Sequence, residues 1–324
     1  MSRSLGADDS CPPADVDEAA ARFRSLTNGK RLLIVLDNAL DTTQVRPLLP
    51  ADPGCGVLIT SRRMPASLDG THQEFLDVLP DSDAIALLTR LVGAERTGAE
   101  ARATADVVRL CGRLPLAISL AAARENSHPG WSVHTMAERL VVEERRLSEL
   151  RSDDRGVRAG FAVGYHGLDH DHRHLFRLIA LLDRSDIDAP VAAALADVPQ
   201  WRAEALLEEL CAARLTESHA PGRHRMHDLL RLFARERALE EDTEAERRQA
   251  VRRGLHCYLA TARATARLAN SRYPWRLEIG PAVADHRGLR FTDLHSVHAW
   301  IDAEAGNLPG SSARRAQPGT TGSR

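Results

Sequence analysis

A short aliphatic run that ends at an acid constrains the fold of this chain more than any other feature. Residues 32–36 read Leu-Leu-Ile-Val-Leu, and Asp37 follows them directly. An apolar run of this length is typical of a strand that is buried on both faces of a parallel sheet. A second run covers 57–60, after a Pro-Gly-Cys-Gly turn, and a third is expected at 75–79. The pattern predicts an α/β layer of only two or three strands, which is an incomplete sheet.

From Ser82 onward the chain has the apolar spacing of helices. A short hairpin is expected at 215–219 and 223–226, because Ala-Pro-Gly between them is a turn sequence. Three helices followed by a hairpin predict a winged helix in this part of the chain. Helices are expected at 14–27, 82–92, 98–111, 114–124, 131–140, in a block over 157–182, and at 189–197, 200–213, 228–239, 243–269 and 294–301.

Composition and charge argue against several classes of function. The 43 basic residues nearly balance the 45 acidic ones, for a net charge of −2, which argues against a surface dedicated to nucleic acid or membrane. The five cysteines are scattered and form no Cys-x-x-Cys, so neither a zinc ribbon nor a redox pair is predicted. No apolar run approaches the roughly 20 residues of a membrane span, and the N-terminus lacks an apolar signal core. We expect a cytoplasmic protein with no membrane contact.

Polar residues follow both predicted strands. Asp37 lies at the carboxyl edge, where α/β sheets place their ligands, and a carboxylate there can hold Mg²⁺. Thr60 and Arg62 end the next strand and can contact a phosphate. The plainer alternatives are an Asp that caps the next turn, and a helix capped by Ser61 with a solvated arginine. Asn38 carries an amide where many ATPases have a second acid, so general-base hydrolysis is not expected.

Two further motifs lie in the helical part of the chain. Residues 112–116 read Gly-Arg-Leu-Pro-Leu and place Pro115 near the start of a helix, where its missing N–H costs nothing. Residues 226–228 read Met-His-Asp, where Asp228 is a natural N-cap and His227, beside a helix N-terminus, can donate to an anion. Taken alone, the first motif can simply mark a helix boundary, and the histidine of the second can form a structural hydrogen bond.

The chain has no phosphate cradle of the P-loop type. That motif is Gly-x-x-x-x-Gly-Lys-Ser/Thr after a strand, because backbone N–H groups and the lysine must enclose the phosphates. Lys30 is the single lysine of the chain, and it precedes a strand in Gly29-Lys30-Arg31, with no hydroxyl residue next. We therefore expect no ATP hydrolysis by this chain and do not class it as an enzyme.

As an ordered set, these motifs resemble the NB-ARC family of STAND nucleotide switches, over roughly residues 15–270. The resemblance is closest to large regulators of actinomycetes, in phrases such as Val-Leu-Asp-Asn-Ala at 35–39 and Cys-Gly-Arg-Leu-Pro-Leu-Ala at 111–117. It implies a switch that is inactive with ADP and opens for oligomerisation on exchange for ATP. The chain is then expected to be an internal piece, or a degenerate copy, of a longer regulator whose P-loop would precede Met1.

The same resemblance implies roles for individual residues. Asp37 would be the Walker B acid that holds Mg²⁺, and Arg62 would be the sensor arginine, beside Thr60 at the end of the same strand. Pro115 would pack against the nucleotide, and His227 would bind the β-phosphate of ADP. The implied cofactors are ADP or ATP with Mg²⁺, and the implied partners are further copies of the chain or other proteins.

The resemblance also implies a fold class and five parts. The class is α/β plus α: a partial P-loop NTPase parallel sheet, a helical subdomain, a winged helix, and the start of a C-terminal helical region. The expected boundaries are 1–79 for the α/β layer, 80–150 for the helical subdomain, 151–240 for the winged helix, 241–310 for the helical region and 311–324 for a disordered tail rich in Ser, Gly, Arg and Thr.

Two other functions stay open. One is an interaction scaffold that works without nucleotide. The other is a DNA-binding regulator, whose recognition helix would be 200–213. That helix carries Glu204, Glu208 and Glu209, and an acidic face repels phosphate, so packing against protein is the better interpretation. Four histidines at 166–174 include a pair at i, i+4, but without a third ligand at fixed spacing we expect solvated side chains and no metal.

Overall fold

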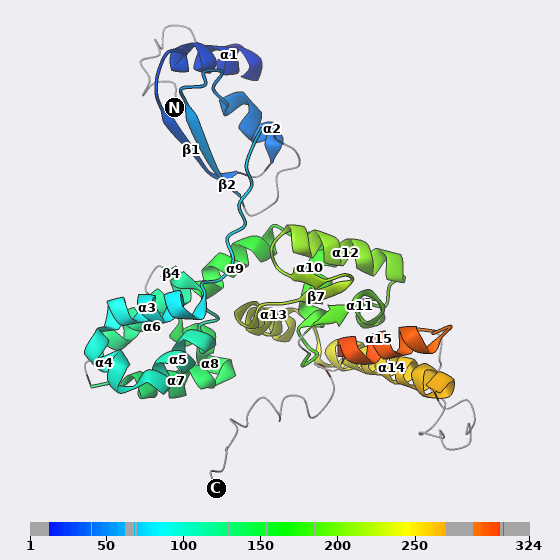
Figure 1. The fold of residues 1–324 in the computed structure, drawn as a ribbon. Coiled ribbons are helices and arrows are strands. Elements are labelled where there is room, and N and C mark those ends of the chain that lie inside the picture. The colour runs from blue at the N-terminus through cyan, green and yellow to red at the C-terminus, as the bar shows by residue number, and fades with distance from the viewer. Residues whose placement is uncertain are drawn as a thin grey trace. The chain divides into compact units, whose positions relative to one another are not determined.

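The computed structural model describes residues 13–39, 41–61, 68, 70–128, 130–152, 155–184, 186–269, 288–304 and 307 (Figure 1). The chain divides into two compact units, Met1–Phe75 with Ala212–Arg214, and Leu76–Cys211 with Leu215–Arg324. The expected tail at 311–324 lies outside the described residues.

The first unit is a small α/β layer. It contains α1 (Val16–Thr27), β1 (Leu33–Ala39), α2 (Thr42–Val45), the 3₁₀ turn η2 (Arg46–Leu48) and β2 (Gly56–Ser61). The two strands pair in parallel, with Leu33 opposite Gly56 and Leu36 opposite Ile59. Figure 1 shows α1 and α2 beside the strands. Their shared core is a cluster of buried side chains: Phe23, Ile34, Leu36, Val45 and Leu68.

The expectation that these strands are buried on both faces is wrong. Burial alternates along β1, with Ile34 and Leu36 in the core. On the other face Leu33 is 72% exposed, Val35 53% and Leu58 54%. Val35 lies opposite Leu58 in the register, so largely exposed apolar side chains lie side by side on this face of the sheet. An apolar run in the sequence cannot distinguish a strand with two covered faces from a strand with one.

The third strand expected at 75–79 is also wrong, since the structure has no strand between 70 and 80. Leu76 is 96% exposed, and the backbone N–H of Leu79 donates to the carbonyl of Arg113 at 3.2 Å. A single bond to a turn between helices replaces the ladder that a strand needs.

The second unit begins with a group of helices. These are α3 (Asp81–Val92), α4 (Ala94–Ala99), α5 (Ala101–Leu110), α6 (Pro115–Asn126), α7 (Val133–Val141) and α8 (Glu143–Glu149), followed by the short pair β3 (Arg151–Ser152) and β4 (Arg155–Gly156). The single helix expected at 98–111 is divided at Glu100, whose φ of −124° and ψ of 49° are not helical. Leu88, Val107, Ile118, Met136 and Leu140 form fully buried core positions of this group.

The rest of the second unit mixes helices with a small sheet. Its elements are α9 (Val157–His166), α10 (His170–Ile179), β5 (Ile187–Asp188), α11 (Ala189–Ala196), α12 (Gln200–Ala212), β6 (Glu217–Ala220), β7 (Arg223–Arg225), α13 (Asp228–Glu241), α14 (Glu244–Ala269) and α15 (Leu294–Glu304). The three strands are antiparallel in the order β5-β7-β6. The helical block expected at 157–182 is two helices, because Asp169 caps a new one by accepting from the N–H of His172 at 3.1 Å.

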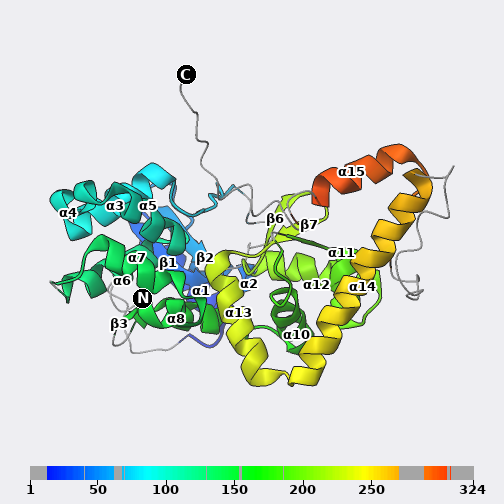
Figure 2. The same cartoon turned by 90° about the horizontal axis from the view of Figure 1, so that it is seen from below.

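Figure 2 shows the long helix α14 following α13, with α11 beside it. No described helix combines the length and the apolar character that crossing a membrane requires.

A buried arginine joins α9, α10 and the end of α13. Arg177 donates twice to Asp242, at 2.7 Å each, and once each to the Tyr165 hydroxyl and to Glu241. Burial alone would lower the pKa of Arg177, but the bonds to Asp242 and Tyr165 raise it above its usual value. Burial, with the hydrogen bond to Glu241, raises the pKa of Tyr165 to about 12. Within this network, Arg177 is therefore charged and Tyr165 is neutral at any ordinary pH.

We expect Arg177→Met to lower the free energy of unfolding by about 3–5 kcal/mol, because the substitution removes the guanidinium that pairs with the buried Asp242 carboxylate. The matched control is Arg158→Met, which removes a partly exposed pair with Glu236 at 2.7 Å and should cost less than about 1 kcal/mol. Urea unfolding followed by far-UV circular dichroism compares the two variants. Equal losses would contradict the role given to Arg177.

The open face of the first unit predicts self-association of the isolated chain, because an exposed apolar sheet beside unpaired strand edges is adhesive. The triple variant Leu33→Thr, Val35→Thr, Leu58→Thr keeps residues suited to strands and should reduce association in analytical ultracentrifugation. The control changes three scattered exposed side chains, Val16→Thr, Val163→Thr and Leu239→Gln, and should have no effect. A wild-type chain that stays a monomer at all concentrations would refute the prediction.

Candidate functional site

The structure brings Asp37 and Thr60 together at the carboxyl ends of β1 and β2. The Thr60 hydroxyl donates a short hydrogen bond to Oδ1 of Asp37 and accepts from the N–H of Asn38, at 2.8 Å. Asn38 adopts a left-handed φ of 55°, and the strand register shifts between Leu36 and Ala39. A bulge of this kind redirects side chains at the end of a strand. Here it holds the Asp37 carboxylate in one orientation on the exposed edge.

This pair has the chemistry of one corner of a magnesium site. Mg²⁺ prefers one or two carboxylates and keeps water and substrate phosphates as its other ligands. Asp37 and Thr60 supply a carboxylate and a hydroxyl, and the part of the chain that is described contains no group of three or more His, Cys, Asp or Glu placed for a metal. The residues present fit a metal only when phosphate or water completes its shell.

The other polar residues after β2 are placed differently. Ser61 is the last residue of the strand, and its hydroxyl donates to the carbonyl of Ala39 at 2.7 Å. The residues of the helix that Ser61 would cap, from 62 to 67, lie outside the described residues. Arg62 lies outside the described residues.

In the second unit, His227 connects two elements that are distant in sequence. It is the N-cap of α13, where Nδ1 accepts from the N–H of Leu229 at 3.2 Å. Its Nε2 lies 2.9 Å from the carbonyl oxygen of Gly112. A carbonyl only accepts, so Nε2 carries the proton, and the two bonds together require the neutral ring in one tautomer. The N-cap expected at Asp228 is wrong by one residue, because Asp228 is the first residue of the helix.

Gly112 is a residue that the sequence interpretation did not include in the site. Its φ is +61°, and a Cβ built on it would lie 2.1 Å from Cε1 and 2.5 Å from Nε2 of His227. Conformation and contact both require glycine at this position. The signal was present in the sequence, since a glycine after a helix marks a left-handed C-cap, but its partner is 115 residues away.

The turn that follows α5 offers no phosphate cradle. The N–H of Gly112 donates to the carbonyl of Arg109 at 2.9 Å, and that of Arg113 donates to Val108 at 3.1 Å. Both amides serve to end the helix. Pro115 begins α6 three residues after Gly112 and is exposed. His227 thus contacts the turn that precedes Pro115 in the second unit, while Asp37 and Thr60 form a pair within the first.

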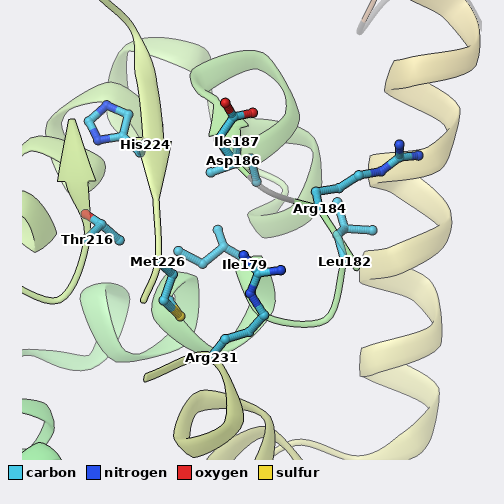
Figure 3. A pocket seen from close by; sticks show the side chains of 9 residues that line it. All are labelled: Ile179, Leu182, Arg184, Asp186, Ile187, Thr216, His224, Met226 and Arg231. Carbon is cyan, nitrogen blue, oxygen red and sulfur yellow. The ribbon is translucent and has the colours of Figure 1, made fainter. Parts of the chain in front are cut away.

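A small cavity lies next to the Met-His-Asp segment. Its lining includes Met226 and Arg231, which Figure 3 shows with Ile179 and Leu182 around a common centre. Its volume of about 20 Å³ is room for about one water and not for a nucleotide. Burial lowers the pKa of Arg231.

Cys111 is buried, and burial raises its pKa to about 12, so this thiol is not a nucleophile.

Of the four histidines at 166–174, His166 and His170 are exposed, as expected from the sequence, and His174 is half-buried. The expectation of a solvated side chain is wrong for His172. His172 is 5% exposed. Its Nδ1 lies 2.6 Å from Asp169, and its Nε2 lies 2.9 Å from Glu209 of α12 without the geometry of a hydrogen bond. His170 and His174 stack with ring centroids 6.3 Å apart. One acid of α12, Glu209, therefore lies close to a buried histidine of α10, with its own side chain 57% exposed.

Comparisons with known proteins relate the chain to regulators. It is 44% identical to the regulatory protein AfsR of Streptomyces griseus over 313 residues, and 44% identical to AfsR of Streptomyces coelicolor over 312. Each match covers 94% of this chain and 31% of the relative, so the chain spans about a third of the length of these regulators. No protein-family model matches the chain. The chain is thus similar to one part of two larger regulatory proteins.

A solved structure was also found, a Signal Transduction ATPase with Numerous Domains (STAND) protein with a tetratricopeptide repeat sensor from Pyrococcus horikoshii. It is 16% identical, and the match covers 85% of this chain and 42% of that one at a TM-score of 0.29. A TM-score of this size does not establish a shared fold.

The contact between Gly112 and His227 predicts a specific stability effect. Gly112→Ala should cost about 1–2 kcal/mol for the left-handed backbone and a further ~1–3 kcal/mol because the methyl group overlaps the imidazole. Gly222→Ala is the matched control, since its φ is +68° with no atom within 4 Å, so it should show the backbone cost alone. Thermal or urea unfolding measures both.

A double variant separates the overlap from the backbone cost. Once His227→Ala has removed the ring, Gly112→Ala should cost no more than Gly222→Ala, so the two substitutions are coupled in a double-mutant cycle. Purely additive losses would contradict the contact.

Proposed function

We propose that this chain is part of an NB-ARC-type regulatory switch that responds to ADP and ATP in the cytoplasm, in signal transduction or transcriptional regulation. The observation that carries the proposal is the 2.9 Å contact between His227 and Gly112, because it joins the Met-His-Asp and Gly-x-Leu-Pro-Leu motifs. The similarity to regulatory proteins supports the regulatory role. In this proposal, residues 151–240 form the winged helix and residues 80–150 the helical subdomain.

In this proposal, each of four residues makes one contact with the nucleotide or its metal ion. Asp37 and Thr60 hold Mg²⁺, which neutralises phosphate charge when bound. Pro115 packs against the nucleotide, and His227 donates Nε2–H to a phosphate oxygen. The neutral ring has only one N–H, which Gly112 already accepts. Phosphate and Gly112 therefore compete for the same proton, and this competition couples nucleotide binding to the contact between the two motifs.

The 324 residues lack the groups that supply most phosphate affinity, since no P-loop occurs among them. One charge-assisted hydrogen bond contributes about 1.5–3 kcal/mol, whereas even millimolar affinity needs about 4 kcal/mol. We therefore expect ADP to bind no tighter than about millimolar to this chain, and ATP turnover to stay at background.

Titration calorimetry with Mg·ADP tests the proposal on two proteins: this chain, and the chain preceded by a strand–P-loop–helix unit. In the extended protein we expect micromolar binding that His227→Ala weakens by about tenfold or more. The control is His134→Ala, an exposed histidine that pairs with Glu138. Micromolar ADP binding to the chain alone, or an extended protein indifferent to His227→Ala, would defeat the assignment.

A scaffold that works without nucleotide is the second candidate. The observation in its favour is that both ring nitrogens of His227 already have protein partners, so the contact with Gly112 is complete without a ligand. The same calorimetry separates the two functions, because a scaffold gives no ADP binding to either protein. A DNA-binding role is weaker, since α12 carries the acids Glu204, Glu208 and Glu209, which repel phosphate, and it buries Ala203, Leu206, Leu207 and Leu210.

A further inference from the structure

Helix α14 carries four arginines within seven residues: Arg247, Arg248, Arg252 and Arg253. Two of them form hydrogen bonds to the ends of other helices. Arg247 donates to the carbonyl of Ala238 in the last turn of α13, at 3.1 Å, and Arg253 donates to that of Ala194 in the last turn of α11, at 2.9 Å. They satisfy carbonyls that a helix end leaves without partners. The other two arginines are not used in this way.

Arg248 and Arg252 border an open groove of about 460 Å³ on the surface of the second unit. Its apolar lining is Leu181, Val251 and Leu255, and Leu255 is 46% exposed. His256 and the stem of Arg247 complete the lining. An apolar floor with a cationic border is the pattern of a groove that receives an amphipathic helix.

The charges at this border are available to a partner. Arg252 makes no hydrogen bond or ion pair with any described residue. Arg248 pairs with Glu244 one turn earlier, and both side chains are largely exposed, at 78% and 67%. An exposed pair at this spacing contributes little stability and is easily replaced.

We propose that this groove binds an acidic amphipathic segment of a partner protein. Apolar side chains at helical spacing occupy the floor formed by Leu181, Val251 and Leu255, and carboxylates pair with Arg248 and Arg252. A guanidinium binds a carboxylate through two parallel hydrogen bonds, which fixes the register of the bound segment.

Charge complementarity selects the occupant. The segment at 270–287 holds three arginines against one glutamate and one aspartate, and that at 305–324 holds three arginines and no acid. Both segments are net basic, so the border repels them. Nucleic acid fits poorly, because the floor is apolar and Glu244 lies beside Arg248. An acidic amphipathic segment of another protein fits both the apolar floor and the cationic border of the groove.

Fluorescence anisotropy with the full chain tests the proposal. The probe is a labelled peptide of about twelve residues with leucine and glutamate at helical spacing. We expect saturable binding that weakens as salt is raised. Two sister peptides, with glutamine for each glutamate and with serine for each leucine, should each bind at least about tenfold more weakly.

Variants of the chain locate the site. Arg252→Glu and Leu255→Ser should each weaken binding by about tenfold or more. The controls Arg102→Glu and Leu239→Ser make the same chemical changes at exposed positions outside the groove and should leave binding unchanged. All four changes are at exposed residues, and circular dichroism verifies that each variant folds.

Three outcomes would overturn the proposal: no saturable binding of the acidic peptide, equal binding of the glutamine peptide, or equal losses in the groove variants and their controls. A labelled DNA duplex is the competing probe. If the duplex binds and Arg252→Glu abolishes that binding while the peptide does not bind, the groove is a nucleic-acid surface. None of these outcomes depends on nucleotide binding, so the inference stands or falls separately from the proposed switch.

Discussion

The last carbonyls of a helix need partners from elsewhere, and this requirement organises the second unit. Arginines supply partners at four helix ends: Arg146 for Leu140 of α7, Arg235 for Ala180 after α10, Arg253 for Ala194 of α11, and Arg247 for Ala238 of α13. At the end of α5, His227 does the same for Gly112. Each bond connects the end of one helix to another element. With a single lysine in the chain, nearly all basic charge resides in the planar, permanently charged group best suited to this task.

His227 differs from the arginines because it satisfies two orphan groups with one ring. Its Nε2–H closes the turn after α5, and its Nδ1 caps the first turn of α13. Only the neutral ring can do both, since an imidazolium has no acceptor. A phosphate that takes the Nε2 proton must therefore release Gly112. The arginines offer no such choice, because each has several donors and its helix-end carbonyl needs only one.

Much of the local structure follows from the sequence. The helices expected at 228–239 and 243–269 are α13 (Asp228–Glu241) and α14 (Glu244–Ala269), and Asp37 and Thr60 meet because parallel strands end at one edge. The expected burial of the strands was wrong for one face of the sheet, since an apolar run does not reveal which neighbouring elements are present. The expectation that His172 is solvated was wrong for a related reason, because Glu209, which lies close to it, belongs to another helix. The contact of His227 with Gly112 spans 115 residues, and no local pattern encodes it.

The two polar groupings of the proposed site differ in chemistry. Asp37 and Thr60 present oxygen atoms on an exposed edge, which suits a cation and repels a bare phosphate. His227 presents one N–H, which suits a phosphate, but the Gly112 carbonyl holds it. Neither grouping alone binds a nucleotide well, because the first needs phosphate to complete a metal shell and the second must give up a protein bond. No P-loop, which would supply most of the affinity in the proposed switch, occurs among these 324 residues. In the switch proposed above, these residues contribute discrimination, because a nucleotide is sensed by whether it takes the His227 proton from Gly112.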